Sequence, residues 1–181
     1  MRFLAAILIS LAFSATAQEL SDDFQSIGEM NLMVDGIEMR LAVVIDLVND
    51  RSFAEVRTLY GTEKMLNVAG VTPVDVGGFD FPMISFTITF NQAGRGNLMF
   101  IEMLEKGRQE FASTTAGAGL GRKELIGFSM DADGAFAFSF AGELLRTVYD
   151  DEYNQLPQEG QAPVIISGSV TVAVPEKYWL Q

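Results

Sequence analysis

Apolar side chains recur at every second position in three separated segments of this chain, with small residues in between. The alternating apolar residues are Phe86, Ile88, Phe90, Phe136, Phe138, Phe140, Val170 and Val172. In a strand, successive side chains point to opposite faces, so a period of two is typical of a strand with one buried face. The pattern therefore predicts strands whose eight apolar residues point inward together, because a slip of one residue would expose all of them.

Turn signals between these segments predict hairpins. Asp35-Gly36 is a two-residue turn between 30–34 and 37–48, since Asp-Gly accepts the positive φ angles of a type I′ turn. A second hairpin joins 125–130 to 135–145 through 131–134, and a third joins 81–91 to 97–104 around Gly94-Arg95-Gly96. Together with the segments 53–60, 64–68, 109–113 and 164–174, this makes about ten strands.

Evidence for helices is poor. The segment 21–30 has room for one helical turn, and 149–156 reads as a short helix or a loop, but neither has a useful apolar stripe at helical spacing. The expected fold is therefore all-β: a single-domain antiparallel β-sandwich, with a closed β-barrel as the alternative. No linker or shift in composition divides 18–181, which we expect to form one domain.

The first 17 residues have the three parts of a secretory signal peptide. Arg2 is the positive residue, an apolar run of signal-peptide length follows, and Ala15-Thr16-Ala17 is the small-residue cleavage pattern. We expect cleavage after Ala17, a mature chain that begins at Gln18, and a periplasmic or secreted location. No later apolar segment is long enough to span a membrane as a helix.

Composition excludes several kinds of chemistry. The chain has no cysteine and no histidine, which removes disulfides, thiol catalysis, histidine catalysis and zinc or iron–sulfur sites that need these ligands. It has 24 acidic and 12 basic side chains, a net charge of −12. This argues against nucleic acid as a partner, because nucleic-acid binding needs a basic surface. No motif indicates a cofactor.

The densest group of carboxylates is Asp150, Asp151 and Glu152, a candidate Ca²⁺ site because clustered carboxylate oxygens suit a hard cation. Its spacing matches no calcium loop, and a solvated acidic loop is the alternative. Asp131-x-Asp133-Gly134 resembles the start of a calcium loop, but a strand pattern follows it, which favours a hairpin turn.

The glycine-rich stretch 117–121, followed by Arg122 and Lys123, resembles a phosphate-binding loop. Such a loop needs a helix after it, and a strand pattern follows here, so we expect a connection between strands. Carboxylates remain the main option for catalysis, with Asp46, Glu102 and Glu143 inside strand-like segments. Ser129 and Ser139 lack the S-x-x-K spacing to Lys123 that serine–lysine chemistry uses.

Methionine is frequent in or beside the expected strands, where it fills a core or lines an adaptable apolar cavity. These methionines are Met33, Met39, Met65, Met83, Met99, Met103 and Met130. The sequence thus predicts an exported, non-enzymatic binding or envelope-accessory protein that acts through protein interaction. A carrier of a small apolar ligand, in a barrel or between sheets, is the first alternative, and a carboxylate-dependent hydrolase is the second.

Overall fold

The computed structural model describes residues 20–59, 61–74, 78–105, 110–114, 121–152 and 154–180. The predicted signal peptide, residues 1–17, lies outside these residues, and so does 117–120 of the glycine-rich stretch. The described part consists almost entirely of strands, with one short 3-10 helix. No helix in it is long and apolar enough to cross a membrane.

The described residues form thirteen strands, where the sequence predicted about ten. They are β1 (Phe24–Val34), β2 (Ile37–Asp46), β3 (Arg51–Ser52), β4 (Ala54–Thr58), β5 (Lys64–Val74), β6 (Gly78–Phe90), β7 (Gly96–Leu104), β8 (Glu110–Thr114), β9 (Lys123–Met130), β10 (Ala135–Tyr149), β11 (Gln155–Pro157), β12 (Val164–Ala173) and β13 (Trp179–Leu180), with the 3-10 helix η1 (Glu176–Tyr178) before β13. The additional strands are β3, β11 and β13, each only two or three residues long, which is too short for a period to be visible in the sequence.

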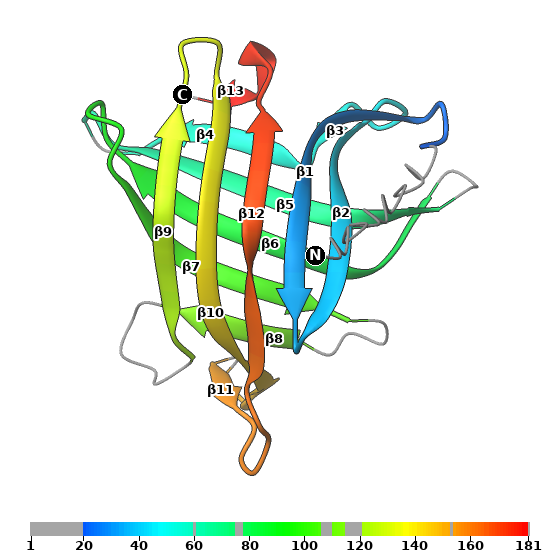
Figure 1. The fold of residues 1–181 in the computed structure, drawn as a ribbon, viewed down its shortest axis with the longest axis vertical. Helices are drawn as coiled ribbons and strands as arrows, with labels where there is room; N and C mark the ends of the chain where they lie inside the picture. Colours follow the sequence, from blue (N-terminus) through cyan, green and yellow to red (C-terminus); the bar gives the residue numbers. More distant parts are fainter. Residues whose placement is uncertain are drawn as a thin grey trace, which may run out of the picture.

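The strands form two layers that cross at a steep angle. Strands β9, β10, β12, β1 and β2 run along the long axis of the view in front, and β4 to β8 run across it behind them (Figure 1). The long strand β10 connects the layers, because its first half pairs with β9 and its second half pairs with β8 and β11. Such orthogonal packing lets strands bend from one layer into the other at a corner.

The predicted antiparallel β-sandwich is confirmed, and the alternative of a closed barrel is not adopted. The sheet follows one open path from β13 to β3. Beyond this path, the single residue pair Ala42–Val71 joins β2 to β5, which is too short to continue the ladder. Neighbouring strands are antiparallel except at β13, which pairs with β4 in parallel.

The core lies between the two layers and consists largely of phenylalanine and aliphatic side chains. All eight residues that the period of two placed inside are buried, with at most 3% of each exposed, so this prediction is confirmed. The ring of Phe86 contacts those of Phe138 and Phe140 edge-on, with centroids 5.5 Å and 4.5 Å away. Such pairs contribute about 0.5–1.5 kcal/mol beyond the burial of their area.

The three predicted hairpins are also present. In the first, Val34 pairs with Ile37 across the turn, and both turn residues have positive φ, 47° at Asp35 and 80° at Gly36. In the second, Met130 pairs with Phe136, and in the third, Phe90 pairs with Gly96. Local turn chemistry was therefore sufficient to predict these connections.

Two segments differ from the sequence-based prediction. Residues 24–30 are not a helical turn but the first half of β1, which continues past a bulge between Ser26 and Gly28 to pair with the end of β2. The bulge shifts the side-chain alternation and hides the period of two. At 149–156, where a short helix or a loop was expected, the turn at 151–152 fits the loop, and the difference is that Gln155 and Leu156 belong to β11, which pairs with the end of β10.

Candidate functional site

Three polar side chains and one phenylalanine form a row across the outer face of β4, β5, β6 and β7. Glu55 on β4 is paired with Asn67 on β5, Asn67 with Thr87 on β6, and Thr87 with Phe100 on β7. Their neighbours along the strands, such as Val56, are buried in the core. Because strand side chains alternate between faces, the four residues of the row point away from the core.

Hydrogen bonds connect the first three residues of this row. Asn67 Nδ2 donates to Glu55 Oε1 at 3.2 Å, and Thr87 Oγ1 donates to Asn67 Oδ1 at 3.0 Å. Arg57 Nε donates to the same Glu55 oxygen at 2.7 Å, and this bond raises the pKa of the guanidinium above its ordinary value. The chain of bonds fixes the orientation of the side chains before any ligand arrives, which lowers the ordering cost of binding.

A second row lies beside the first, and the two rows form the floor of a groove. Ala69 on β5 is paired with Ser85 on β6, and Ser85 with Glu102 on β7. Ser85 Oγ donates to Glu102 Oε2 at 3.4 Å. The groove has a volume of about 640 Å³ and is open to solvent. This is within the range of about 300–1,000 Å³ that is common for ligand sites.

Apolar and cationic side chains border this polar floor. Phe100 and Met83 come from the strands, and Arg51 comes from β3, where its guanidinium carbon lies 5.5 Å from the ring centre of Phe53. Tyr178 belongs to the C-terminal segment and is also part of the lining. We call the whole surface the β4–β7 groove. It combines fixed hydrogen-bonding groups with aromatic contact area, which suits specific binding.

The acidic group Asp150, Asp151 and Glu152 lies in the turn between β10 and β11. The carboxylate of Asp150 accepts hydrogen bonds from the backbone nitrogens of Glu152 at 2.9 Å and Asn154 at 2.8 Å, and from Asn154 Nδ2 at 2.9 Å. These bonds lower the pKa of Asp150, with the Asn154 side chain as the largest cause. Asp150 thus stabilises its own turn, and no set of three acidic residues suited to a metal ion is found among the described residues.

The Asp131-x-Asp133-Gly134 motif is a turn between β9 and β10. Asp131 Oδ1 accepts hydrogen bonds from the backbone nitrogens of Asp133 at 2.9 Å and Ala135 at 2.8 Å, and Gly134 has a φ of 79°. This is the expected hairpin turn. After the glycine-rich stretch, strand β9 begins at Lys123, so the strand that we expected in place of a helix is present.

The three carboxylates considered for catalysis lie in different places. Asp46 ends β2 and accepts hydrogen bonds from the backbone nitrogens of Val48 and Asn49 and from the Asn49 side chain. Glu102 lies in the β4–β7 groove, and Glu143 lines a separate hollow beside Lys123 and Ile165. The fold therefore does not gather these three side chains into one site.

The serine and lysine candidates are also far apart along β9 and β10. Ser129 and Lys123 are six residues apart on β9, about 20 Å at strand spacing. Ser139 pairs with Gly127, four residues or about 13 Å from Lys123 along β9. Burial lowers the pKa of Lys123. None of these spacings brings a serine hydroxyl within hydrogen-bond reach of the amine.

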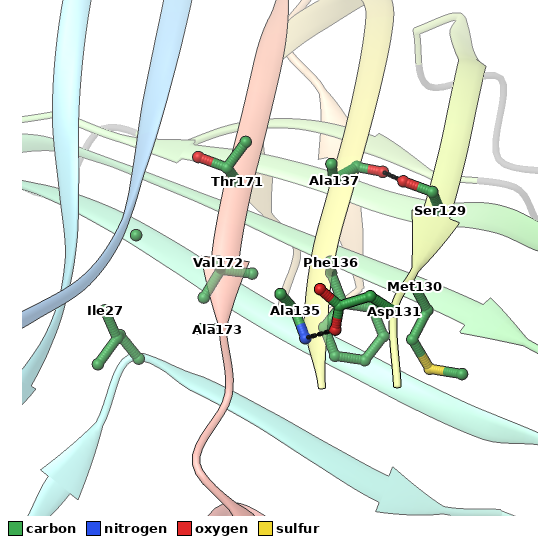
Figure 2. Close-up of a pocket in the computed structure, with 11 residues that line it drawn as sticks. Ile27, Ser129, Met130, Asp131, Ala135, Phe136, Ala137, Thr171, Val172 and Ala173 are labelled. Atoms are coloured by element: carbon green, nitrogen blue, oxygen red, sulfur yellow. Dashed lines mark hydrogen bonds between the residues drawn. The ribbon is translucent and has the colours of Figure 1, made fainter. Parts of the chain in front are cut away.

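A second hollow, of about 420 Å³, lies on the outer face of β9, β10 and β12 (Figure 2). Its floor consists of small side chains such as Ala137 and Thr171, with Ile27 to one side and Met130 to the other. Ser129 Oγ donates to the backbone oxygen of Ala137 at 3.3 Å. This hollow offers few polar groups to orient a ligand, so the β4–β7 groove is the stronger candidate.

Sequence reasoning singled out Glu102 and Met83 but missed the polar row and the arginines of the groove. Glu55, Arg57, Asn67 and Thr87 have no motif and no distinctive local spacing. They share only one property: each is on the polar face of a strand in which polar and apolar side chains alternate. Many residues of any β-sheet protein have this property. The sequence matches no model of a known protein family and no curated protein. The candidate site therefore rests on the geometry of the β4–β7 groove.

Proposed function

We propose that this chain is an exported, non-enzymatic binding protein, and that it recognises a segment of a partner protein in the β4–β7 groove. The observation that carries the proposal is the hydrogen-bonded row Glu55–Asn67–Thr87, bordered by aromatic, methionine and arginine side chains. A preorganised polar floor next to apolar anchors is the arrangement that gives protein interfaces both affinity and orientation.

The composition of the border favours a protein partner. Tyrosine, phenylalanine, methionine and arginine are the residue types enriched in protein–protein interfaces, and lysine is depleted there. Five residues of the enriched types line the β4–β7 groove: Tyr178, Phe100, Met83, Arg51 and Arg57. The net charge of −12 adds a long-range attraction for basic partners and repels polyanions such as nucleic acid.

The packing of the interior favours this proposal over a carrier of a small apolar ligand. Five phenylalanine rings contact one another in pairs between the layers, in the space that an enclosed ligand would need. They are Phe86, Phe90, Phe136, Phe138 and Phe140. A carrier would retain lipid through purification, so organic extraction and mass spectrometry distinguish the two functions. Co-purified lipid, together with a fluorescence gain from an apolar dye, would favour the carrier.

Strand spacing supports a binding role over a two-carboxylate hydrolase. Glu55 on β4 and Glu102 on β7 are separated by three strand spacings, about 14 Å, and Glu102 is also displaced two residues along its strand. Glycosidases place their two carboxyl groups about 5–9.5 Å apart. In addition, Glu55 Oε1 already accepts a hydrogen bond from Arg57 Nε at 2.7 Å.

Peptide selection followed by a groove variant tests the proposal. Random peptides displayed on phage are selected on the mature wild-type protein, and the affinities of synthetic copies are measured by calorimetry. We expect Thr87→Arg, which fills the centre of the β4–β7 groove, to abolish their binding. Ile126→Arg is the matched control, because it adds the same side chain at a position that is 63% exposed on β9, outside the groove.

Melting curves establish that both variants are folded. Peptides that bind Thr87→Arg as tightly as the wild type would show that recognition occurs elsewhere on the surface. A selection that yields no binding peptide would also count against the proposal, since a groove built for a protein segment accepts short peptides that carry its key side chains.

A further inference from the structure

Asp50, in the loop between β2 and β3, contacts two consecutive residues near the other end of the chain. Lys177 Nζ donates to Asp50 Oδ1 at 2.7 Å, and the hydroxyl group of Tyr178 donates to the same oxygen at 3.1 Å. These partners are 127 and 128 residues away in the sequence. One carboxylate oxygen thus connects the loop to the C-terminal segment 175–180.

We infer that the C-terminal segment is a wall of the β4–β7 groove, and that Asp50 is the positioning residue that sets Tyr178 in this wall. The inference rests on the proposed function, and it adds the part of the groove that discriminates among partner segments. Tyr178 is the only lining residue of this groove that comes from outside 50–102, within the described part of the chain.

The backbone of Asp50 has an unusual conformation. Its φ is 46°, in the left-handed region, where few residues other than glycine are found. Aspartate tolerates this conformation better than most side chains, but it still has a cost, and residues held in this way are frequent at functional sites. The two hydrogen bonds lower the pKa of Asp50, with that from Lys177 as the larger cause, so the carboxylate stays charged.

The neighbour of Tyr178 is anchored independently of Asp50. Trp179 Nε1 donates to the backbone oxygen of Val174 at 3.1 Å, and its ring lies 6.1 Å from that of Phe136 and 4.5 Å from Lys64 Nζ. Its backbone also pairs with Val56 on β4. The anchor keeps the C-terminal segment beside the groove, and Asp50 then fixes the side chain of Tyr178.

The contact at Asp50 is the weaker of the two attachments of the C-terminal segment. The side chain of Lys177 is 57% exposed and that of Asp50 is 77% exposed. An ion pair so exposed is weak and is screened by salt, whereas the anchor at Trp179 is partly buried and aromatic. Tyr178 is therefore held less firmly than Trp179, and its ring offers an apolar face to the bound peptide while its hydroxyl donates to Asp50.

The test compares Asp50→Asn with Asp35→Asn in the mature protein. Asp35 also has a positive φ, 47°, but lies in the turn between β1 and β2, away from the groove. Both changes remove one charge and keep a side chain that tolerates this backbone. Two quantities are measured: amide hydrogen exchange of a peptide fragment that covers 176–180, and the affinity of a synthetic peptide selected on the wild-type protein.

We expect Asp50→Asn to speed amide exchange in 176–180 and to weaken the binding of the peptide by up to about fivefold, the upper limit for the loss of an exposed ion pair. Tyr178→Phe removes the hydroxyl that donates to Asp50 and should weaken the binding of the peptide in the same direction. Asp35→Asn should change neither quantity. Unchanged exchange in Asp50→Asn would refute the positioning role without any reference to a ligand.

The peptide measurements separate the remaining outcomes. In one outcome, exchange rises in Asp50→Asn and the affinity for the peptide does not change, while Thr87→Arg abolishes binding. The C-terminal segment is then not a wall of the β4–β7 groove, and the groove remains the binding site. If Thr87→Arg also leaves affinity unchanged, the proposed function fails and the inference about Tyr178 fails with it.

Discussion

The ring of Phe86 on β6 lies edge-on to the ring of Phe138 on β10, with the ring centroids 5.5 Å apart and an angle of 71° between the planes. The two strands belong to opposite layers of the sandwich, so this contact crosses the core. Both side chains are almost completely buried, at 1% and 3% exposure. The two layers therefore depend on each other for the burial of their phenylalanines.

Phe138→Ala should destabilise the protein by about 3–5 kcal/mol, because it removes a buried ring and leaves a cavity between the layers. The free energy of unfolding is measured by denaturant titration. Ile126→Ala, at a position that is 63% exposed, is the control and should change stability by less than about 0.5 kcal/mol. A loss below about 1 kcal/mol for Phe138→Ala would contradict its place in a packed core.

Gly28→Ala should destabilise the protein by about 1–3 kcal/mol or more, because β1 and β12 come very close at this point. An added Cβ atom would lie 2.2 Å from the backbone oxygen of Thr171, which cannot move without disturbing the ladder. Gly127→Ala is the matched control, since a Cβ atom there meets nothing within 4 Å. Equal melting temperatures for the two variants would show that the strands separate at little cost.

The pKa of Asp50 should be below the ordinary aspartate value, because Lys177 and Tyr178 both donate to its carboxylate. A lowered pKa means that the contact stabilises the fold above the ordinary value of about 3.9 and is lost as pH falls through the lowered value. The same contact raises the pKa of Lys177, so its contribution persists until pH rises through that raised value.

An NMR titration of the Asp50 carboxyl carbon measures this shift. In Lys177→Met, which removes the larger of the two causes, the pKa of Asp50 should move back toward the ordinary value. An Asp50 that titrates at the same pH in both proteins would mean that the ion pair with Lys177 does not persist in solution.

Calcium should stabilise the protein no more than magnesium or matched sodium chloride, because the Asp150 carboxylate is occupied by hydrogen bonds from Glu152 and Asn154. Melting curves with EDTA, Ca²⁺, Mg²⁺ and NaCl measure this. If calcium bound there, a Ca²⁺ concentration of 100 times its dissociation constant would add about 2.7 kcal/mol to the free energy of unfolding. For a domain of this size, this raises the melting temperature by several degrees. Such a rise, specific to Ca²⁺, would establish the acidic turn as a metal site.

The mature protein should begin at Gln18, as the tripartite pattern of the first 17 residues predicts. N-terminal sequencing of the protein from the periplasm or the medium tests this. An Ala15→Arg variant, which destroys the small-residue cleavage pattern, should accumulate as the uncleaved chain. A soluble wild-type product that begins at Met1 would contradict export.

The period of two was sufficient to predict which side chains of β6, β10 and β12 enter the core, since side-chain direction in a strand depends only on the local backbone. The turns at Asp35-Gly36 and 131–134 could also be predicted from the sequence, because the conformation of a tight turn depends on the φ angles that its own residues accept. Where a bulge interrupts the alternation, at Ile27 in β1, the sequence-based prediction was wrong.

The sequence by itself determined the all-β class, the hairpins and the buried faces, and it excluded chemistry that needs cysteine or histidine. Only the tertiary structure decided that β10 pairs with both layers and that Glu55, Asn67 and Thr87 form one row across neighbouring strands. It also brought Asp50 to Tyr178, 128 residues away. The physical reason is that side-chain direction and turn geometry are local, whereas a groove depends on which distant strands pair and in what register, which the packing of the whole core selects.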